Sequence, residues 1–261
     1  MNTRRHLIMM AFMLAAFVSH PSYCEAADNH GIFTELLSAH VDQGEVDYKN
    51  LCQDNNLDLY IEQLSNTDPE KILMREAKLA FWLNAYNAYT LKIICDNYPL
   101  KSISELHTGG LIFGSVIRRT VWHKKLVTIN NELTSLDHIE HKIIRPIFKE
   151  PRIHFAVVCA AKGCPPLRNE AYEAERLDEQ LADQAEVFLS QKDKNNFDLK
   201  TKTARISPIF SWFKKDFISE SGGVLEYLVP FMNAEIGASI KNDPKSWRIK
   251  YTKYDWSLNE Q

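Results

Sequence analysis

The sequence has no long run of a single charge. Its 261 residues include 31 Lys and Arg against 34 Asp and Glu, for a formal net charge of −3, and both signs are scattered along the whole length. Proteins that bind nucleic acid gather their basic residues on one face or one segment. The sequence therefore indicates no nucleic-acid partner.

Internal repeats, low-complexity tracts and Pro/Gly-rich linkers are also absent between residues 30 and 261. The chain is 45% hydrophobic and is long enough to enclose a sizeable core. We therefore predict a single domain over residues 27–261.

Two common ligand-binding signatures are missing as well. The glycines of HTGGLIFG, residues 107–114, indicate a sharply bent loop, but no Gly-Lys-Ser/Thr follows them and no strand precedes them, which excludes a phosphate-binding loop. No histidines recur with the i, i+4 spacing and no Cys-x2-Cys hook occurs, so a strong metal signature is lacking. The sequence gives no reason to assign a metal or a cofactor.

The N-terminus carries a targeting pattern. Arg4 and Arg5 precede an apolar run over residues 7–18, and the small residues Ala26 and Ala27 follow a polar patch. This order is typical of a secretory signal peptide, and the run is too short for a membrane span. We predict that residues 1–26 are a signal peptide, that the mature chain has no transmembrane segment, and that the protein is periplasmic or secreted.

Removal of this segment would take Cys24 with it and leave Cys52, Cys95, Cys159 and Cys164. An even number of cysteines in an oxidising compartment makes disulfides plausible. The mature chain is too large to need them as a scaffold, so we expect one bridge or none.

Helical patterns dominate the first part of the chain. We predict helices over residues 33–40 and 57–64, and a long one from near Pro69 that contains EAKLAFWLNAYNAYTLKIIC. The long helix is apolar on nearly every side and should be buried. Asn84 and Asn87 then lie one turn apart inside the core, where their amides must either bond the backbone or orient a functional group.

Strands and helices mix in the second part. Residues 121–129 and the tail around 248–254 have the pattern of half-buried strands, whereas 135–145 and 177–190 have the pattern of amphipathic helices. No regular βαβ repeat is present. The sequence therefore predicts an α+β fold, with a helical N-terminal part followed by a mixed sheet with packed helices.

Candidate chemistry gathers in RIHFAVVCAAKGCPP, residues 152–166. If 153–159 is a strand, His154 and Cys159 lie about 17 Å apart on opposite faces and do not form a local pair. Cys164 lies in a turn stiffened by two prolines, beside Lys162, and a nearby cation lowers the pKa of an exposed thiol.

Three interpretations of these thiols stay open. In the first, Cys159 is a nucleophile, His141 or His154 is its base and Glu140 orients the imidazole, as in a thiol-dependent hydrolase or acyl transferase of papain-like or transglutaminase-like type. Asn84, Asn87 and Cys164 would then support the site or bind substrate.

The second interpretation is a non-catalytic periplasmic protein that binds a partner, with Cys159 and Cys164 in a disulfide. The third is a metal site built from His141, His154 and a cysteine. Hydrogen-bond reach between His141 and Cys159 would favour the enzyme. A bonded pair of Cys159 and Cys164 would favour the binding protein. The substrate or partner is unknown in each case.

Several motifs occur in order: FWLNAYNAYTLK, LTSLDHIEHKIIR, RIHFAVVCAAKGCPPLR, ISPIFSWFKKDF and YDWSLN. Together they closely resemble the domain of unknown function DUF547, over roughly residues 79–259. The resemblance implies an exported bacterial member and implies no particular reaction. The motif positions in this chain are Asn84, Asn87, Glu140, His141, His154, Cys159, Cys164 and Pro165.

Overall fold

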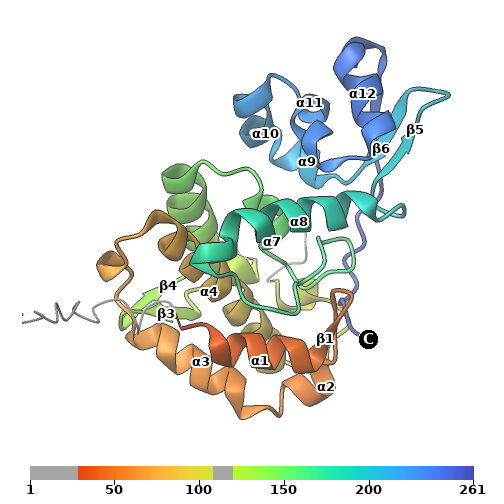
Figure 1. The fold of residues 1–261 in the computed structure, drawn as a ribbon. Helices are drawn as coiled ribbons and strands as arrows, with labels where there is room; N and C mark the ends of the chain where they lie inside the picture. The colour runs from red at the N-terminus through yellow and green to blue at the C-terminus, as the bar shows by residue number, and fades with distance from the viewer. Residues whose placement is uncertain (1–28, 108–119) are drawn as a thin grey trace, which may run out of the picture.

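The computed structural model describes residues 29–107 and 120–261. The predicted signal peptide lies outside these ranges, and so does the stretch HTGGLIFG apart from its first residue, His107. Within the described residues the chain is mainly helical and carries three small sheets (Figure 1).

The long helix α4 (Arg75–Cys95) organises the first half of the chain. It packs against α3 (Asn55–Asn66), which in turn contacts α1 (Gly31–His40). The other helical elements are α2 (Tyr48–Leu51), α6 (Leu136–His138), the π-helix η4 (Ile139–Phe148), α7 (Ile153–Ala156), α8 (Leu177–Ser190), α9 (Ile209–Trp212), α10 (Lys214–Ser221), α11 (Val224–Leu228), α12 (Ala234–Asn242), and the 3-10 turns η1 (Pro69–Lys71), η2 (Ile103–Leu106), η3 (Val121–His123), η5 (Ala174–Arg176), η6 (Val229–Phe231) and η7 (Pro244–Ser246).

Helix α4 is buried on all sides, as its sequence predicts. Residues 79–91 are buried without exception. The predicted start near Pro69 is wrong, because Pro69 opens the separate turn η1, which the Asp68 side chain caps through the Glu70 N–H. The backbone is extended again at Ile72 and Met74 before α4 begins.

The strands form two hairpins and one mixed sheet, which confirms the α+β class. The pairs are β1 (Val41–Asp42) with β2 (Glu45–Val46), antiparallel; β3 (Val127–Ile129) with β4 (Glu132–Thr134), antiparallel; and β5 (Asn196–Asp198), β6 (Thr203–Ile206) and β7 (Arg248–Tyr251), with β5–β6 antiparallel and β6–β7 parallel. Of the predicted strand region 121–129, only β3 is a strand; its beginning is the turn η3.

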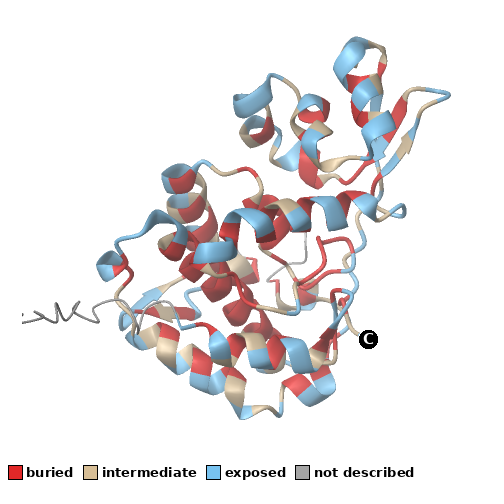
Figure 2. Cartoon of the chain, viewed as in Figure 1, coloured by how far each residue is buried: buried red, intermediate tan, exposed pale blue. Residues whose placement is uncertain are grey.

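Two apolar clusters form the core, and α8 joins them (Figure 2). Leu177 and Leu181 belong to the cluster around α4, whereas Ala185 and Phe188 belong to the cluster beneath α9–α12. Figure 1 shows α8 running between these two parts. The amphipathic helix predicted over residues 177–190 is thus confirmed, and its buried face packs into both clusters.

The predicted helix 135–145 exists but changes its winding. Ser135 caps it, because the Ser135 hydroxyl accepts from the His138 N–H at 3.2 Å. From Ile139 the chain winds as the π-helix η4. A π-helix has wider turns than an α-helix and rotates later residues away from the expected face. Ile147 is consequently 61% exposed, although in an unbroken α-helix it would share a face with the buried Ile139.

Residues 153–159 are not the predicted strand. Ile153–Ala156 form the short, fully buried helix α7, and only the following residues are extended. The apolar run suits either structure, and tertiary packing decides between them. The segment has no neighbouring strand among the described residues; the Asn87 amide bonds its backbone instead.

The C-terminal tail also departs from the expected half-buried strand. All four residues of β7 are exposed, because β7 lies at the edge of its sheet. Beyond β7 the tail returns to the N-terminal half, where the Val46 N–H donates to the Asn259 carbonyl at 2.8 Å. Figure 1 shows the C-terminus close to β1.

Two disulfides are present, one more than expected. Cys52–Cys95 ties the end of α2 to the end of α4, and Cys159–Cys164 closes a short loop. The sequence could not show that Cys52 and Cys95, 43 residues apart, meet in space. No helix in the described ranges has both the length and the apolar composition needed to cross a membrane.

Candidate functional site

A cavity of about 680 Å³ brings together most of the predicted site residues. Glu140 and His141 reach it from η4, His154 from α7, and Cys159 and Cys164 from the loop after α7. The expected separation of His154 and Cys159 onto opposite faces is therefore wrong. It assumed a strand, and the helical turn of α7 places both side chains on one cavity.

Asn84 and Asn87 do not line this cavity; they fix the backbone behind it. Asn84 bonds both backbone groups of Tyr172, each at 2.8 Å. Asn87 donates to the Ala156 carbonyl at 2.9 Å and accepts from the Val158 N–H at 3.0 Å. Both amides are buried, so each satisfies two backbone groups that would otherwise lack partners.

His154 is held by a carboxylate that the sequence did not identify. Its Nε2 lies 2.7 Å from Asp216 Oδ2, and Asp216 also pairs bidentately with Arg145 at 2.7 and 3.0 Å. Hydrogen bonds from His154 and Arg145 hold the pKa of Asp216 well below its usual range. Burial lowers the pKa of His154, although the contact with Asp216 opposes this, and a neutral imidazole can bond the Asp216 carboxylate only by donating through Nε2.

The other ring nitrogen of His154 has no partner in the part of the chain that the structure describes. Nδ1 is buried and makes no hydrogen bond with any described residue. The ring stacks on Phe213 with centroids 3.9 Å apart, which fixes its plane. With Nε2–H bound to Asp216, Nδ1 carries a free lone pair, as a general base requires.

His141 is constrained differently. Its Nδ1 lies 3.0 Å from Arg145 Nη1, and because a guanidinium only donates, His141 accepts there and carries its proton on Nε2. Burial lowers the pKa of His141, while the charge of Asp137 opposes this. Among the described residues neither His141 nor His154 hydrogen-bonds Cys159, so the contact that would favour the enzyme directly is not made.

Glu140 is a buried carboxyl group at the cavity wall. Burial raises the pKa of Glu140 to about 7, although a hydrogen bond from Tyr86 and the charge of Arg145 oppose the rise. Its Oε1 has no hydrogen-bond partner among the described residues and lies 3.8 Å from His141 Nδ1, beyond hydrogen-bond distance. Glu140 is therefore poised to exchange a proton near neutral pH rather than to orient His141.

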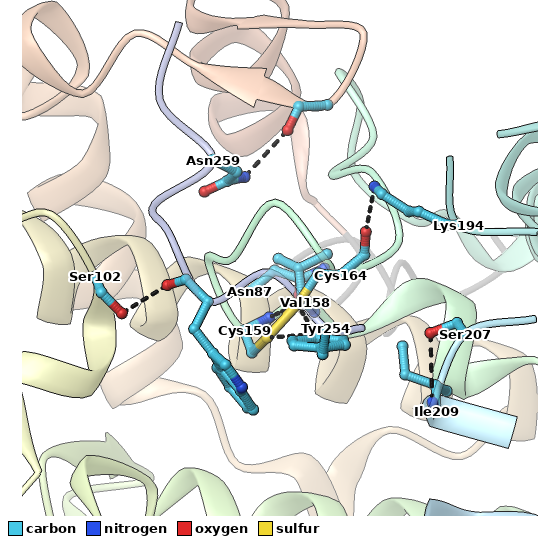
Figure 3. Close-up of a disulfide and its surroundings, with 12 residues drawn as sticks. Asn87, Ser102, Val158, Cys159, Cys164, Lys194, Ser207, Ile209, Tyr254 and Asn259 are labelled. Atoms are coloured by element: carbon cyan, nitrogen blue, oxygen red, sulfur yellow. Dashed lines mark hydrogen bonds between the residues drawn. A yellow bond between two sulfur atoms is a disulfide. The ribbon is translucent and has the colours of Figure 1, made fainter. Parts of the chain in front are cut away.

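The disulfide Cys159–Cys164 lies in the cavity wall beside Tyr254. The Tyr254 hydroxyl lies 3.1 Å from each sulfur atom, and Figure 3 shows its ring beside the sulfur–sulfur bond. The Cys159 N–H also donates to Cys164 Sγ at 3.0 Å. Lys194 Nζ donates to the Cys164 carbonyl at 2.8 Å. Cys164 is only 4% exposed, whereas Cys159 is half-buried.

The C-terminal tail positions this loop. The Lys162 N–H donates to the Ser257 carbonyl and the Gly163 N–H to the Asp255 carbonyl, both at 2.8 Å. A Cβ on Gly163 would lie 2.9 Å from the Asp255 backbone, so only glycine permits this approach. These contacts place Tyr254, which belongs to the same tail, against the disulfide.

Aromatic side chains form another part of the cavity wall. Tyr254 lies 4.6 Å from Trp256 and 4.8 Å from Trp212 between ring centroids, and Trp122 lies 6.1 Å from Trp256. Trp212 is 51% exposed. Apolar walls with a few convergent polar groups are typical of pockets that bind small molecules or chain segments.

The metal interpretation gains no support. In the described ranges no three His, Cys, Asp or Glu side chains are grouped so that they could hold a metal ion. The bonded cysteines also lack the thiolates that a metal would bind.

The fold and site thus define an α+β chain whose cavity is lined by a disulfide, imidazoles and a buried carboxyl group. Residues 70–189 match the family model described as "Protein of unknown function, DUF547". This stretch of the chain is a DUF547 domain. The comparisons found no match among curated proteins and none among solved structures.

Sequence reasoning missed Asp216, Tyr254 and Tyr86 as members of the site. Asp216 lies in the motif ISPIFSWFKKDF and Tyr254 in YDWSLN, both quoted for the family resemblance. Their place in those motifs was the available signal. Nothing in the local pattern shows that they meet residues 154–164, because those contacts span 62 to 95 positions of sequence.

Proposed function

We propose that this protein is a thiol-dependent hydrolase or acyl transferase, with Cys159 as its nucleophile after the Cys159–Cys164 disulfide is reduced. The observation that carries the proposal is His154: Asp216 holds one ring nitrogen, and the other is buried beside the cavity that Cys159 lines and bonds no residue that the structure describes. This is the base-and-orienter half of a catalytic triad.

In this mechanism His154 Nδ1 takes the proton of the Cys159 thiol, and the thiolate attacks an acyl carbon to form a thioester. The same proton then passes to the leaving group. Asp216 stabilises the imidazolium that forms in between, and Arg145 keeps Asp216 ionised and oriented. Water or a second nucleophile finally cleaves the thioester, which distinguishes hydrolysis from transfer.

Glu140 supplies a second proton-transfer group. With the pKa of Glu140 raised to about 7, its carboxyl group is partly protonated at neutral pH and could protonate a leaving group at the cavity wall. We assign it this role in place of the orienting role that its sequence position suggested.

A non-catalytic binding protein is the second candidate, and the disulfide favours it. Both thiols are bonded, and the aromatic wall alone suffices to hold a ligand. In this case His154 and Asp216 would serve only to join α7 to α10.

The decisive experiment measures thiol reactivity in the fully reduced mature protein. Iodoacetamide at pH 5.5 and 8.5, followed by peptide mapping, should alkylate Cys159 at the lower pH while Cys52 and Cys95 stay unmodified, since a thiolate paired with an imidazolium persists below the ordinary thiol pKa of about 8.5. With p-nitrophenyl acetate, Cys159 should become acetylated as p-nitrophenolate is released.

His154→Gln and Asp216→Asn should each slow both reactions of Cys159 at least about tenfold. His138→Gln is the matched control, because His138 is exposed and does not line the cavity. Denaturant midpoints identify any variant that is merely unfolded. If Cys159 stays unreactive at both pH values after reduction, the enzyme proposal fails and the binding protein takes its place.

A further inference from the structure

The disulfide in the cavity wall has unequal ends. Both cysteines line the cavity, but Cys159 is half-buried whereas Cys164 is only 4% exposed. An incoming thiolate must approach one sulfur and expel the other, and the rate rises with access to the first and with the acidity of the second. Exposure therefore favours attack at Cys159.

The surroundings of Cys164 suit a leaving thiolate. The Cys159 N–H donates to Cys164 Sγ at 3.0 Å, and the Tyr254 hydroxyl, which lies 3.1 Å from both sulfur atoms, can donate to Cys164 Sγ once the bridge opens. Burial raises the pKa of Tyr254, so its hydroxyl keeps the proton that it donates. The Lys194 ammonium on the Cys164 carbonyl adds a nearby positive charge. Donors and cations of this kind stabilise a thiolate.

The second disulfide provides a comparison within the molecule. Cys52 and Cys95 are also half-buried, but among the described residues no polar group bonds either sulfur. Exposure alone would give the two bridges similar rates of exchange. The groups around Cys164 make the difference.

We infer that Cys159–Cys164 is a thiol–disulfide exchange site that a dithiol opens by attacking Cys159. The dithiol's thiolate forms a bond to Cys159 Sγ as the Cys159–Cys164 bond breaks and its electron pair passes to Cys164. The dithiol's second thiolate then attacks the dithiol's first sulfur, which is bonded to Cys159 in the mixed disulfide, and Cys159 leaves as a thiolate. The two thiol protons end on Cys159 and Cys164, the bridge is reduced by two electrons, and the dithiol leaves as a disulfide.

A dithiol fits better than a monothiol because the second step is then intramolecular and needs no further molecule in the cavity. The inference rests on the proposed function in one respect: the thiol that is released is the proposed nucleophile. The bonded form is then the inactive state of the enzyme, and the dithiol is its activator.

The test uses the oxidised mature protein. Dithiothreitol is added, samples are quenched with iodoacetamide over time, and peptide mapping follows each bridge. Cys159–Cys164 should open at least about tenfold faster than Cys52–Cys95. Equal rates, or faster opening of Cys52–Cys95, would overturn the inference.

The attacked sulfur is identified with glutathione and an N-ethylmaleimide quench, which blocks the thiol that leaves. Glutathione should be found on Cys159 and the maleimide on Cys164. The reverse pattern would mean attack at Cys164, which borders both this cavity and a neighbouring one, and would refute the assignment.

Tyr254→Phe should slow the opening of Cys159–Cys164 by roughly three- to tenfold and leave Cys52–Cys95 unchanged, since it removes one hydrogen bond to the leaving thiolate. Tyr89→Phe is the control, because the Tyr89 hydroxyl bonds the Thr128 carbonyl instead. An unchanged rate in Tyr254→Phe would remove the role assigned to the hydroxyl and contradict the inference.

The two proposals fail in different ways. Suppose that the bridge opens selectively at Cys159 but that Cys159, once reduced, reacts like an ordinary thiol. This result would refute the enzyme and support the exchange site. A reactive Cys159 in protein reduced with excess phosphine, combined with slow or unselective opening by dithiothreitol, would do the opposite.

Discussion

The Asn87 side-chain amide accepts a hydrogen bond from the Val158 N–H at 3.0 Å, one residue before Cys159. The same amide donates to the Ala156 carbonyl at 2.9 Å. A side chain of the central helix α4 thus takes the place of a neighbouring strand for the segment that carries the candidate nucleophile. The position of Cys159 therefore depends on the core rather than on its own loop.

Asn87→Leu should destabilise the protein by about 2–4 kcal/mol, because two buried backbone groups lose their partner. Urea denaturation measures the change in the free energy of unfolding. Asn66→Leu is the control, since Asn66 is exposed on α3 and its amide bonds only its own helix. Similar midpoints for Asn87→Leu and the wild type would show that the Asn87 bonds do not hold the segment.

Glu140→Gln should stabilise the protein at alkaline pH. The folded state keeps a proton on Glu140 up to about pH 7, whereas an ordinary glutamate side chain loses it near 4.5. Between about pH 4.5 and pH 7 the folded state binds more protons than the unfolded state, so the free energy of unfolding falls as pH rises through this range. The whole decrease is about 3 kcal/mol. Glu140→Gln has no carboxyl group at this position, so its free energy of unfolding does not decrease in this way.

Free energies of unfolding at pH 5 and pH 8 test this prediction. The advantage of Glu140→Gln over the wild type should be small at pH 5 and about 1–3 kcal/mol at pH 8. Glu186→Gln, an exposed carboxyl group on α8, should show no such trend. The same difference at both pH values would mean that the pKa of Glu140 is not raised.

The two disulfides should stabilise the fold unequally. Cys52–Cys95 spans 43 positions and Cys159–Cys164 only 5, so the first restricts the unfolded chain more. Chain entropy gives about 4 kcal/mol for the first and about 2 kcal/mol for the second. Denaturant curves of the two double Cys→Ala variants compare them directly, and a reversed order would contradict the entropic account.

Export should remove about the first 26 residues, because Arg4 and Arg5, the apolar run at residues 7–18 and the small residues after it follow the signal-peptide pattern. Intact-mass measurement of protein recovered from the periplasm checks this. Protein that keeps residues 1–26 there would contradict the prediction, and so would its complete retention in the cytoplasm.

Local sequence pattern was sufficient for the helices whose apolar spacing is unambiguous. The all-round apolar sequence of α4 predicted its burial, and the amphipathic pattern of residues 177–190 predicted α8, because the 3.6-residue period by itself assigns each side chain to a face. The need of Asn84 and Asn87 for partners also followed from sequence, since a buried amide must be bonded.

Tertiary structure decided the rest. The run 153–159 suits a strand or a helix equally, and the absence of a neighbouring strand together with the Asn87 amide selects the helix α7. The winding of η4 likewise overrides the α-helical period and turns Ile147 outward.

The sequence by itself determined which residue types the site contains: one thiol pair, two imidazoles and a carboxyl group within residues 140–164. Only the fold decided their relationships, bonding Cys159 to Cys164, placing Asp216 on His154 and bringing Tyr254 to the sulfur atoms. The physical reason is range. A helical or strand period relates residues a few positions apart, whereas these contacts arise when separate apolar segments bury one another, and no local pattern encodes which distant segments will meet.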